Sequence, residues 1–263
     1  MSDYQTRFAG IGRLYGQRAL QYFRGSHVCV IGIGGVGSWC AESLARSGIG
    51  KITLIDLDDV CTTNTNRQIH ALRSQIGESK TAVMRTRILD INPECECLEV
   101  EDFITPSNLN DYISDEFDYV IDAIDSVKAK AALISFCKYR KIKLISIGGA
   151  GGQIDPTQIV IGDLAKTIQD PLAKKVRSEL RRFYNFTKNP KRKFGVDCVY
   201  STEQLIYPDN DGETCMAKNT QDGSMRMDCS EGFGAVTHIT ASFGFFAVSR
   251  VLKKLAEQSA KSL

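Results

Sequence analysis

The chain has 263 residues, of which 43% are hydrophobic and 24% are charged, and its formal net charge is +2. This composition is typical of a folded globular protein and excludes collagen-like and disordered classes, while the net charge alone indicates no partner. The nine cysteines form no CxxC pair, so we expect a reduced, cytoplasmic protein that uses cysteine as a small apolar residue. The first residues contain no apolar targeting segment, so we expect no signal peptide.

Apolar runs and helical patterns alternate along the first 150 residues. We expect strands at 27–33, 51–57, 96–100, 117–125 and 142–149, and helices at 38–47, 78–90 and 126–141. Strands that alternate with helices predict a doubly wound, mainly parallel, Rossmann-like α/β sheet. Ligands bind such sheets at the carboxyl ends of the strands.

The pattern changes after about residue 160. We therefore divide the chain into a core at 1–160 and a smaller C-terminal α+β portion at 161–263 that completes the same domain. The second portion contains a basic helical stretch at 164–195, a strand at 196–205 and a long polar loop at 207–230, for which we leave open whether it acts as a lid. Segment 232–249 has no charged residue but three glycines and four hydroxyl residues, which favours a buried or interface helix over a membrane span.

Residues 32–37 read Gly-Ile-Gly-Gly-Val-Gly, a G-x-G-x-x-G turn between an expected strand and an expected helix. Such glycines let the backbone approach a phosphate, and the helix N-terminus offers unpaired N–H groups to it. Asp56 lies 19 residues past Gly37 at the end of the next strand, where a carboxylate binds ribose hydroxyls. The sequence therefore predicts a nucleotide site at 1–160 rather than a merely tight turn.

Four charged residues distinguish ATP from a redox cofactor. Arg67 and Lys80 can reach a triphosphate, which a nicotinamide site would not need. Asp122 and Asp125 end a further strand, where carboxylates suit Mg²⁺ bound with phosphate oxygens. Each residue alone can be a solvated charge or a helix cap, but their order along the chain favours ATP. An NAD-dependent oxidoreductase or a redox-sensing module is the alternative from another class.

These motifs resemble the adenylating family that includes ubiquitin-activating enzymes and the activators of molybdopterin- and thiamin-pathway sulfur carriers. The shared features are the glycine turn, a D-x-D at 56–58, an N-x-x-R-Q run at 64–68, a G-x-x-K at 77–80 and a D-x-x-D-S at 122–126. The resemblance implies ATP and Mg²⁺ as cofactors, with Asp125 as the metal ligand. It implies catalytic roles for Arg67, Lys80 and Asp125, and for an N-terminal arginine that reaches across a homodimer, for which Arg13 is our first choice and Arg7 the second. The implied ATP-binding residues are Gly32, Gly34, Gly35, Gly37, Asp56, Asp58, Asn64, Arg67, Gln68, Lys80, Asp122, Asp125 and Ser126.

Two motifs in the second half, GVDCVYSTEQL at 195–205 and MDCSEGFGAVT at 227–237, are similar to those of the bacterial tRNA threonylcarbamoyladenosine dehydratases. The two zinc-binding CxxC pairs usual in carrier-activating relatives are absent. The resemblance implies that a threonylcarbamoyladenosine beside the tRNA anticodon is adenylated and cyclised, with ATP converted to AMP and pyrophosphate, and it implies an association with a cysteine-desulfurase sulfur-transfer system. Adenylation of a small sulfur-carrier protein, or a non-catalytic role in sulfur transfer, stays open, as does a bound monovalent cation.

A basic segment offers a surface for tRNA. Residues 174–193 carry nine Lys and Arg residues against a single acid, Glu179, with three aromatic residues at 183, 184 and 186. This pattern is typical of RNA binding, although a solvated helix with inward aromatics would share it. We predict tRNA contacts at Lys174, Lys175, Arg177, Arg181, Arg182, Lys191, Arg192 and Lys193.

Four residues with reactive side chains are open to a structural or a chemical role. Cys198 and Cys229 lie in the C-terminal motifs, and for both we favour structure over thioester or persulfide chemistry. We expect His70 and His238 to be packed or capping residues rather than general bases.

Overall fold

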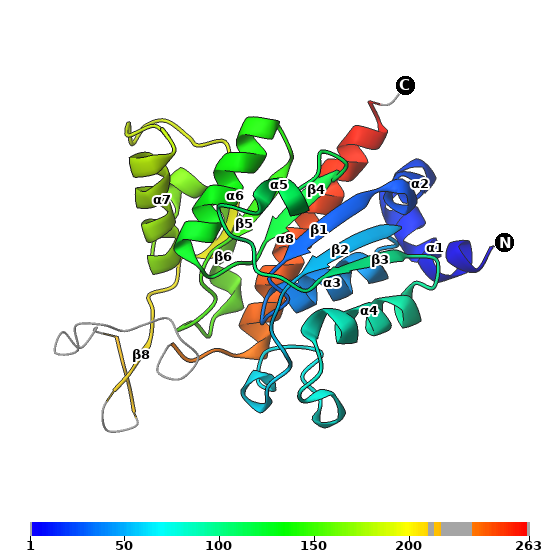
Figure 1. The fold of residues 1–263 in the computed structure, drawn as a ribbon, viewed down its shortest axis with the longest axis horizontal. Coiled ribbons are helices and arrows are strands. Elements are labelled where there is room, and N and C mark those ends of the chain that lie inside the picture. Colours follow the sequence, from blue (N-terminus) through cyan, green and yellow to red (C-terminus); the bar gives the residue numbers. More distant parts are fainter. Residues whose placement is uncertain (1, 210–212, 217–232, 262–263) are drawn as a thin grey trace.

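The computed structural model describes residues 2–209, 213–216 and 233–261 (Figure 1). Its centre is a seven-stranded sheet in the order β3-β2-β1-β4-β5-β7-β6. The strands are β1 (His27–Ile31), β2 (Lys51–Ile55), β3 (Glu96–Val100), β4 (Tyr119–Asp122), β5 (Leu144–Ile147), β6 (Ile159–Asp163) and β7 (Asp197–Ser201). Only the pairing of β6 with β7 is antiparallel in this sheet of described residues. The prediction of a doubly wound, mainly parallel sheet is confirmed.

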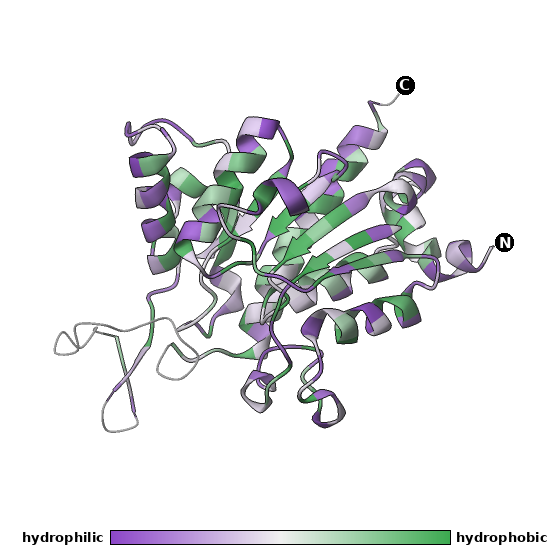
Figure 2. Ribbon diagram, in the orientation of Figure 1, coloured by the Kyte–Doolittle hydropathy of each residue, from purple (hydrophilic) through white to green (hydrophobic). Residues whose placement is uncertain are grey.

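The central strands are buried on both faces, as their unbroken apolar sequences predict. Alternate residues of β1 point to opposite sides, since Val28 and Val30 join one apolar cluster while Cys29 and Ile31 join another. The first cluster also holds residues of α3, α4 and α8, and the second holds residues of α6. The sheet therefore lies between two helical layers, with green inner and purple outer helix surfaces in Figure 2.

The helices have the following bounds: α1 (Asp3–Tyr15), α2 (Gln17–Gly25), α3 (Gly37–Arg46), α4 (Lys80–Ile91), α5 (Leu109–Tyr112), α6 (Val127–Arg140), α7 (Pro171–Phe183) and α8 (Thr237–Ser259). Short 3₁₀ turns are η1 (Thr62–Asn64), η2 (Arg73–Gln75), η3 (Pro156–Gln158) and η4 (Leu164–Lys166). Helix α8 returns from the C-terminal portion to pack along α3 and α2, so residues 161–263 complete the layers that 1–160 begin.

The structure adds elements that the sequence patterns did not indicate. Helices α1 and α2 and the edge strand β6 were not expected. Part of the expected loop at 207–230 is a short hairpin of β8 (Tyr207–Pro208) and β9 (Thr214–Cys215), while 210–212 and 217–230 lie outside the described residues. The helix expected at 232–249 begins at Thr237 and continues to Ser259; its Phe243 is fully buried in the core, while Phe245 and Phe246 are 44% and 36% exposed. Within the described ranges, every helix is too short or too polar to cross a membrane.

Candidate active site

A cavity of about 1240 Å³ opens at the carboxyl ends of β1, β2, β4 and β5. We call it the central cavity. It lies where the strand order reverses between β1 and β4, which is where ligands bind in doubly wound folds. The predicted ATP-binding residues that line it are Gly32, Gly34, Gly35, Asp56, Asp58, Asn64, Arg67, Gln68, Lys80, Asp125 and Ser126.

The glycine turn brings backbone close to the central cavity. Gly32 has a φ of +86°, and a Cβ on it would lie 2.8 Å from the Ala123 carbonyl oxygen. Gly37 does not line the cavity; a Cβ there would lie 1.7 Å from the Gly32 carbonyl oxygen, so this glycine closes the turn against the helix. The N–H groups of Gly34, Gly35 and Val36 donate to no acceptor within the described chain. They are available to an anion at the start of α3.

Asp56 is held rigidly at the end of β2. Its Oδ2 accepts a hydrogen bond from the Ile33 N–H at 2.5 Å, and its Oδ1 accepts one from the Asp58 N–H at 2.9 Å. Burial raises the pKa of this carboxyl, and the nearby Lys80 ammonium offsets part of that effect. The side chain is 7% exposed and faces the cavity, as a ribose-binding carboxylate requires.

Two cations approach the same side of the cavity. Lys80 begins α4, and its Nζ lies 2.7 Å from Asp58 Oδ2. The Arg67 Nη1 donates to the Thr63 carbonyl at 2.7 Å, while the Arg67 carbonyl accepts from the Trp39 Nε1 at 3.0 Å. Arg67 lies in the loop after η1, where a Cβ on Gly35 would be 3.3 Å from its Cδ, and both cations line the cavity together with Gly34 and Gly35. Charge at this position suits a polyphosphate.

Asp122 and Asp125 occupy very different surroundings, which corrects one prediction. Asp122 is fully buried and does not line the cavity; its Oδ1 lies 3.0 Å from Lys130 Nζ and its Oδ2 accepts from Ser146 Oγ at 2.8 Å. Its carboxylate is already used by these partners and does not face a metal ion in the cavity. Asp125 lies on the cavity wall and is exposed. It is the carboxylate that can meet a metal and phosphate oxygens.

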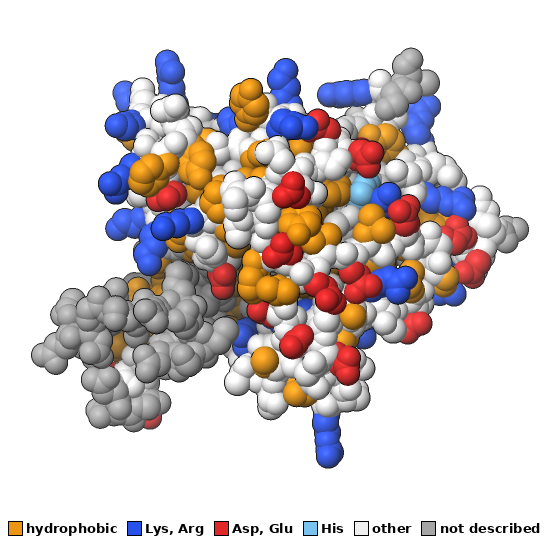
Figure 3. Space-filling view, viewed as in Figure 1, with side chains coloured by type: hydrophobic (Ala, Val, Ile, Leu, Met, Phe, Trp, Pro, Cys, Tyr) orange, Lys and Arg blue, Asp and Glu red, His pale blue; other side chains and the backbone are white. Residues whose placement is uncertain are grey.

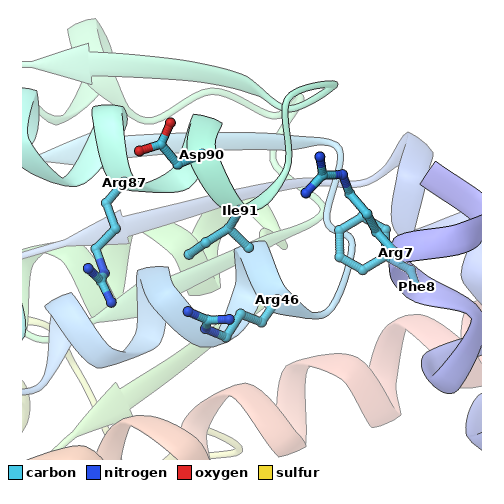
Figure 4. A pocket seen from close by; sticks show the side chains of 6 residues that line it. All are labelled: Arg7, Phe8, Arg46, Arg87, Asp90 and Ile91. Atoms are coloured by element: carbon cyan, nitrogen blue, oxygen red, sulfur yellow. The ribbon is translucent and has the colours of Figure 1, made fainter. Parts of the chain in front are cut away.

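The N-terminal arginines lie away from the central cavity. Arg13 is exposed on α1 and is absent from the cavity wall. Arg7 pairs with Asp3 at 2.6 Å and lines a separate hollow of about 480 Å³ beside Phe8, which Figure 4 shows between α1, α3 and α4. The structure contains one chain, so a role for either arginine across a dimer stays a prediction.

The predicted tRNA-binding residues lie on α7 and the loop that follows it. Figure 3 shows Lys and Arg side chains gathered over α7. Arg177 is half-buried and donates to Thr167 Oγ1, and Arg181 lies 5.3 Å from the centre of the Phe194 ring, so these two also support the fold. The exposed members are Lys174, Lys175, Arg182, Lys191, Arg192 and Lys193.

The aromatic residues beside them differ: one packs inward, as in a solvated helix, and one is exposed, as RNA stacking would require. Phe186 packs edge-on against Phe194 at 4.9 Å, whereas Phe183 is 58% exposed.

The cysteine and histidine side chains fit structural roles. Cys198 is fully buried, and burial raises the pKa of its thiol well above the usual value, which disfavours a thiolate. Cys229 lies outside the described residues. Burial, with help from Lys80, lowers the pKa of His70 to about 4. His238 Nε2 lies 3.1 Å from the Ile154 carbonyl oxygen. Neither histidine lines the central cavity.

Another part of the cavity wall contains residues that the sequence analysis did not place in the site. It is formed by the glycine-rich loop after β5, the first turn of α7 and two residues from distant segments, Leu205 and Phe233. The glycine-rich loop follows an expected strand, and Leu205 and Phe233 lie in the two C-terminal motifs at 195–205 and 227–237, but neither motif indicated a place in the cavity. Tertiary packing brings these segments together.

The fold and the cavity define a nucleotide-binding protein of the Rossmann-like class, and residues 5–262 match the family model of the ThiF family. The chain belongs to this family. It is 60% identical over 258 residues to the tRNA threonylcarbamoyladenosine dehydratase of Escherichia coli strain K12, which covers 98% of this chain and 96% of that relative. The protein of the same name from Bacillus subtilis strain 168 is 45% identical over 191 residues, 73% of this chain and 72% of that one.

Solved structures agree with these relatives. The E. coli tRNA N6-threonylcarbamoyladenosine dehydratase in complex with ATP has a TM-score of 0.89 and 56% identity, covering 100% of this chain and 99% of that one. By contrast, the E. coli molybdopterin-synthase adenylyltransferase is 32% identical over 131 residues, 50% of this chain and 51% of that protein. The resemblance stated from the sequence motifs is confirmed.

Proposed function

We propose that this chain is an adenylating enzyme that uses ATP to dehydrate threonylcarbamoyladenosine in tRNA to its cyclic form. The observation that carries the proposal is the similarity to dehydratases over nearly the whole chain, whereas similarity to a carrier adenylyltransferase covers half of it. The ATP complex of a relative with the same fold supports ATP as the cosubstrate.

The geometry of the central cavity supports a specific placement of ATP. The unpaired N–H groups of Gly34 and Gly35, with Arg67 and Lys80, would hold the phosphates. Asp56 would bind the ribose hydroxyls. The donor set fits Mg²⁺, because one carboxylate, Asp125, together with phosphate oxygens is the usual way proteins bind that ion. Magnesium bound there would neutralise charge on the phosphates.

The reaction needs positioned charges rather than a protein nucleophile. A threonyl carboxylate oxygen attacks the α-phosphorus of ATP, and the bond from that phosphorus to the bridging oxygen breaks to release pyrophosphate. The carbamoyl group then attacks the acyl carbon, loses a proton and expels AMP, which keeps one carboxylate oxygen. The net result is the loss of one water from the nucleoside. Lys80 and Arg67 would stabilise charge on the phosphate oxygens in the first step.

The partners of the enzyme are part of the same proposal. The basic surface of α7 would bind tRNA, and a homodimer would bring Arg13 of one chain to the ATP of the other. A cysteine-desulfurase system is the proposed protein partner. Mixing Arg13→Ala and Lys80→Ala chains tests the dimer, because a mixed dimer has one intact site if Arg13 acts across the interface. Recovered turnover supports that role, and no recovery argues against it.

Mass spectrometry of nucleosides tests the central proposal. Threonylcarbamoyl-modified tRNA incubated with the protein, ATP and Mg²⁺ should lose one water from that nucleoside, and Lys80→Ala should prevent the loss. A heavy-oxygen label in the threonyl carboxylate should reappear in AMP, which hydrolysis of ATP alone would not produce. An unchanged nucleoside mass, with pyrophosphate exchange stimulated by a small sulfur-carrier protein, would support the carrier-activating alternative instead.

A further inference from the structure

The central cavity extends past the residues assigned to ATP. Pockets for one drug-sized ligand usually occupy about 300–1000 Å³, and this cavity of about 1240 Å³ has a further wall that begins at the end of β5, whereas the glycine turn follows β1. We call this wall the acceptor wall and define it by Gly148–Gly151, Pro171, Leu172, Leu205 and Phe233. It contains no charged side chain.

The loop of the acceptor wall carries unused hydrogen-bond donors. Gly148 N–H donates to the Val199 carbonyl at 2.8 Å, and Gly149 N–H donates to Asp170 Oδ2 at 3.1 Å. The next two N–H groups, those of Ala150 and Gly151, donate to no acceptor in the part of the chain that the structure describes. Adjacent backbone donors of this kind bind carboxylate or carbonyl oxygens.

The same loop is packed directly against an aromatic side chain. A Cβ on Gly151 would lie 2.8 Å from the Phe233 Cβ, and one on Gly152 would lie 2.8 Å from Phe233 Cδ1. The Phe233 ring is in turn 5.1 Å from the Tyr207 ring. The donors and an aromatic surface are therefore neighbours on one wall. A planar base can stack on such a ring.

A buried carboxylate fixes this wall to the basic helix. Asp170 is 5% exposed, and its Oδ1 accepts from the Ala173 N–H at 2.8 Å as the N-cap of α7. Its Oδ2 accepts from Gly149, so one side chain joins the glycine loop to the first turn of α7. The helix that begins at the cavity wall then carries the exposed lysines described above. A polyanion bound along α7 would lead into the cavity at this point.

From these contacts we infer that the acceptor wall is the binding site for the modified purine nucleoside, an inference that rests on the proposed function. The N–H groups of Ala150 and Gly151 hold the carboxylate or carbamoyl oxygens of the threonylcarbamoyl group. Phe233 stacks on the purine. This arrangement places the acyl group between the two walls, beside the phosphates held by the glycine turn.

Steady-state kinetics of Phe233→Ala tests the site. The expected result is a rise of about 10-fold in the KM for modified tRNA, because removing an aromatic–base stack has an effect of that order, with an unchanged Kd for ATP measured by calorimetry. The free threonylcarbamoyladenosine nucleoside, used as a competitive inhibitor, should weaken by the same factor. Phe233→Tyr keeps the ring and should restore both values.

A matched control is Tyr139→Ala, because Tyr139 is 86% exposed on α6 and does not line the cavity. It should leave the KM for tRNA and the Kd for ATP unchanged. An unchanged KM and inhibitor affinity in Phe233→Ala, or equal losses of tRNA and ATP affinity, would overturn the assignment. The wild-type protein must first be shown to remove water from modified tRNA. If it does not, the proposed function itself has failed, independently of Phe233.

Discussion

Two lysine–aspartate pairs lie near the ends of β2 and β4, the strands on either side of β1, and their aspartates differ in burial. Lys80 and Asp58 approach to 2.7 Å on the cavity wall, where the Lys80 side chain is 6% exposed but the Asp58 side chain is 53% exposed. Lys130 and Asp122 approach to 3.0 Å beneath the cavity, and their side chains are 1% and 0% exposed. In addition, Lys130 Nζ donates to the carbonyls of Asp122 and Ile124 at 3.1 and 2.9 Å.

The difference in burial separates a binding group from a supporting one. A cation beside an exposed carboxylate can exchange that partner for a phosphate at little cost in stability. A fully buried pair cannot, because removing either member leaves an unpaired charge away from water. The Lys130 pair holds the backbone just before Asp125, and so supports the carboxylate that faces the cavity.

Removing Lys130 should give the largest effect on stability. Lys130→Met leaves the Asp122 carboxylate buried without its cation, so the free energy of unfolding should fall by about 3–5 kcal/mol. Urea denaturation measures this loss. The double variant Asp122→Asn with Lys130→Met should recover part of it, because no buried charge then lacks a partner. Equal stabilities of Lys130→Met and the control Lys128→Met, whose lysine is exposed on the same helix, would contradict the distinction.

Lys80 should show the opposite behaviour, with a large effect on turnover and a small one on folding. Lys80→Ala removes a cation from the proposed phosphate site, so the rate of adenylation should fall by about 100- to 1000-fold. The Lys80 side chain is buried, but its partner carboxylate is half exposed and stays in contact with water, so the free energy of unfolding should fall by less than in Lys130→Met. Single-turnover pyrophosphate release and urea denaturation measure the two quantities.

Asp125→Ala is expected to resemble Lys80→Ala, with a comparable fall in the rate of adenylation and an intact fold, measured by the same two assays. Normal turnover in either variant would remove that residue from the site.

These two pairs also mark what the sequence can and cannot predict. The glycine turn, Asp56 and Lys80 were predictable because short motifs place them at strand ends of a recognisable sheet. Asp122 and Asp125 follow the same strand, and the spacing gave both a place in the site. The structure distinguishes the two residues, because Lys130 on α6 pairs with Asp122 inside the protein and leaves only Asp125 at the cavity.

The acceptor wall could not be predicted for a related reason. Leu205 and Phe233 reach the cavity from segments more than 50 residues after the glycine loop at 148–151, so tertiary packing alone brings them together. Both residues lie in the C-terminal motifs at 195–205 and 227–237, but a motif does not show which cavity its residues line.

The histidine behind Lys80 offers a pH test of the same region. His70 is 1% exposed, neither ring nitrogen has a partner within the described residues, and burial lowers its pKa to about 4. The unfolded chain takes up a proton below about pH 6.5 while the folded chain does not, so stability present above pH 6.5 is lost as the pH falls toward 4. This loss should amount to about 3 kcal/mol.

His70→Gln removes this titration, so the variant should lose less stability than the wild type between pH 7 and pH 4. Urea denaturation at both pH values measures the difference. Equal losses of stability in the two proteins would show that His70 takes up a proton in the folded state. The buried region behind Lys80 would then tolerate a second positive charge.

The basic surface should give the smallest effect for each residue changed, because exposed charges act singly and are screened by salt. The structure favours Lys174, Lys175, Lys191 and Arg192 as targets, since Arg177 and Arg181 also hold the fold through Thr167 and Phe194. Changing the four to Gln should weaken tRNA binding and reduce the slope of log K against log salt by about 0.7–0.9 for each phosphate that is no longer neutralised. Filter binding over a range of salt concentrations measures the slope.

Changing Lys253 on α8 and Lys261, just after this helix, to Gln serves as a control for α7, because both side chains are exposed and lie outside the central cavity. This control should leave the salt slope unchanged. A slope that responds to α8 and not to α7 would move the RNA surface to the opposite end of the sheet. It would also separate the acceptor wall from the path of the tRNA, since α7 is the helix that begins on that wall.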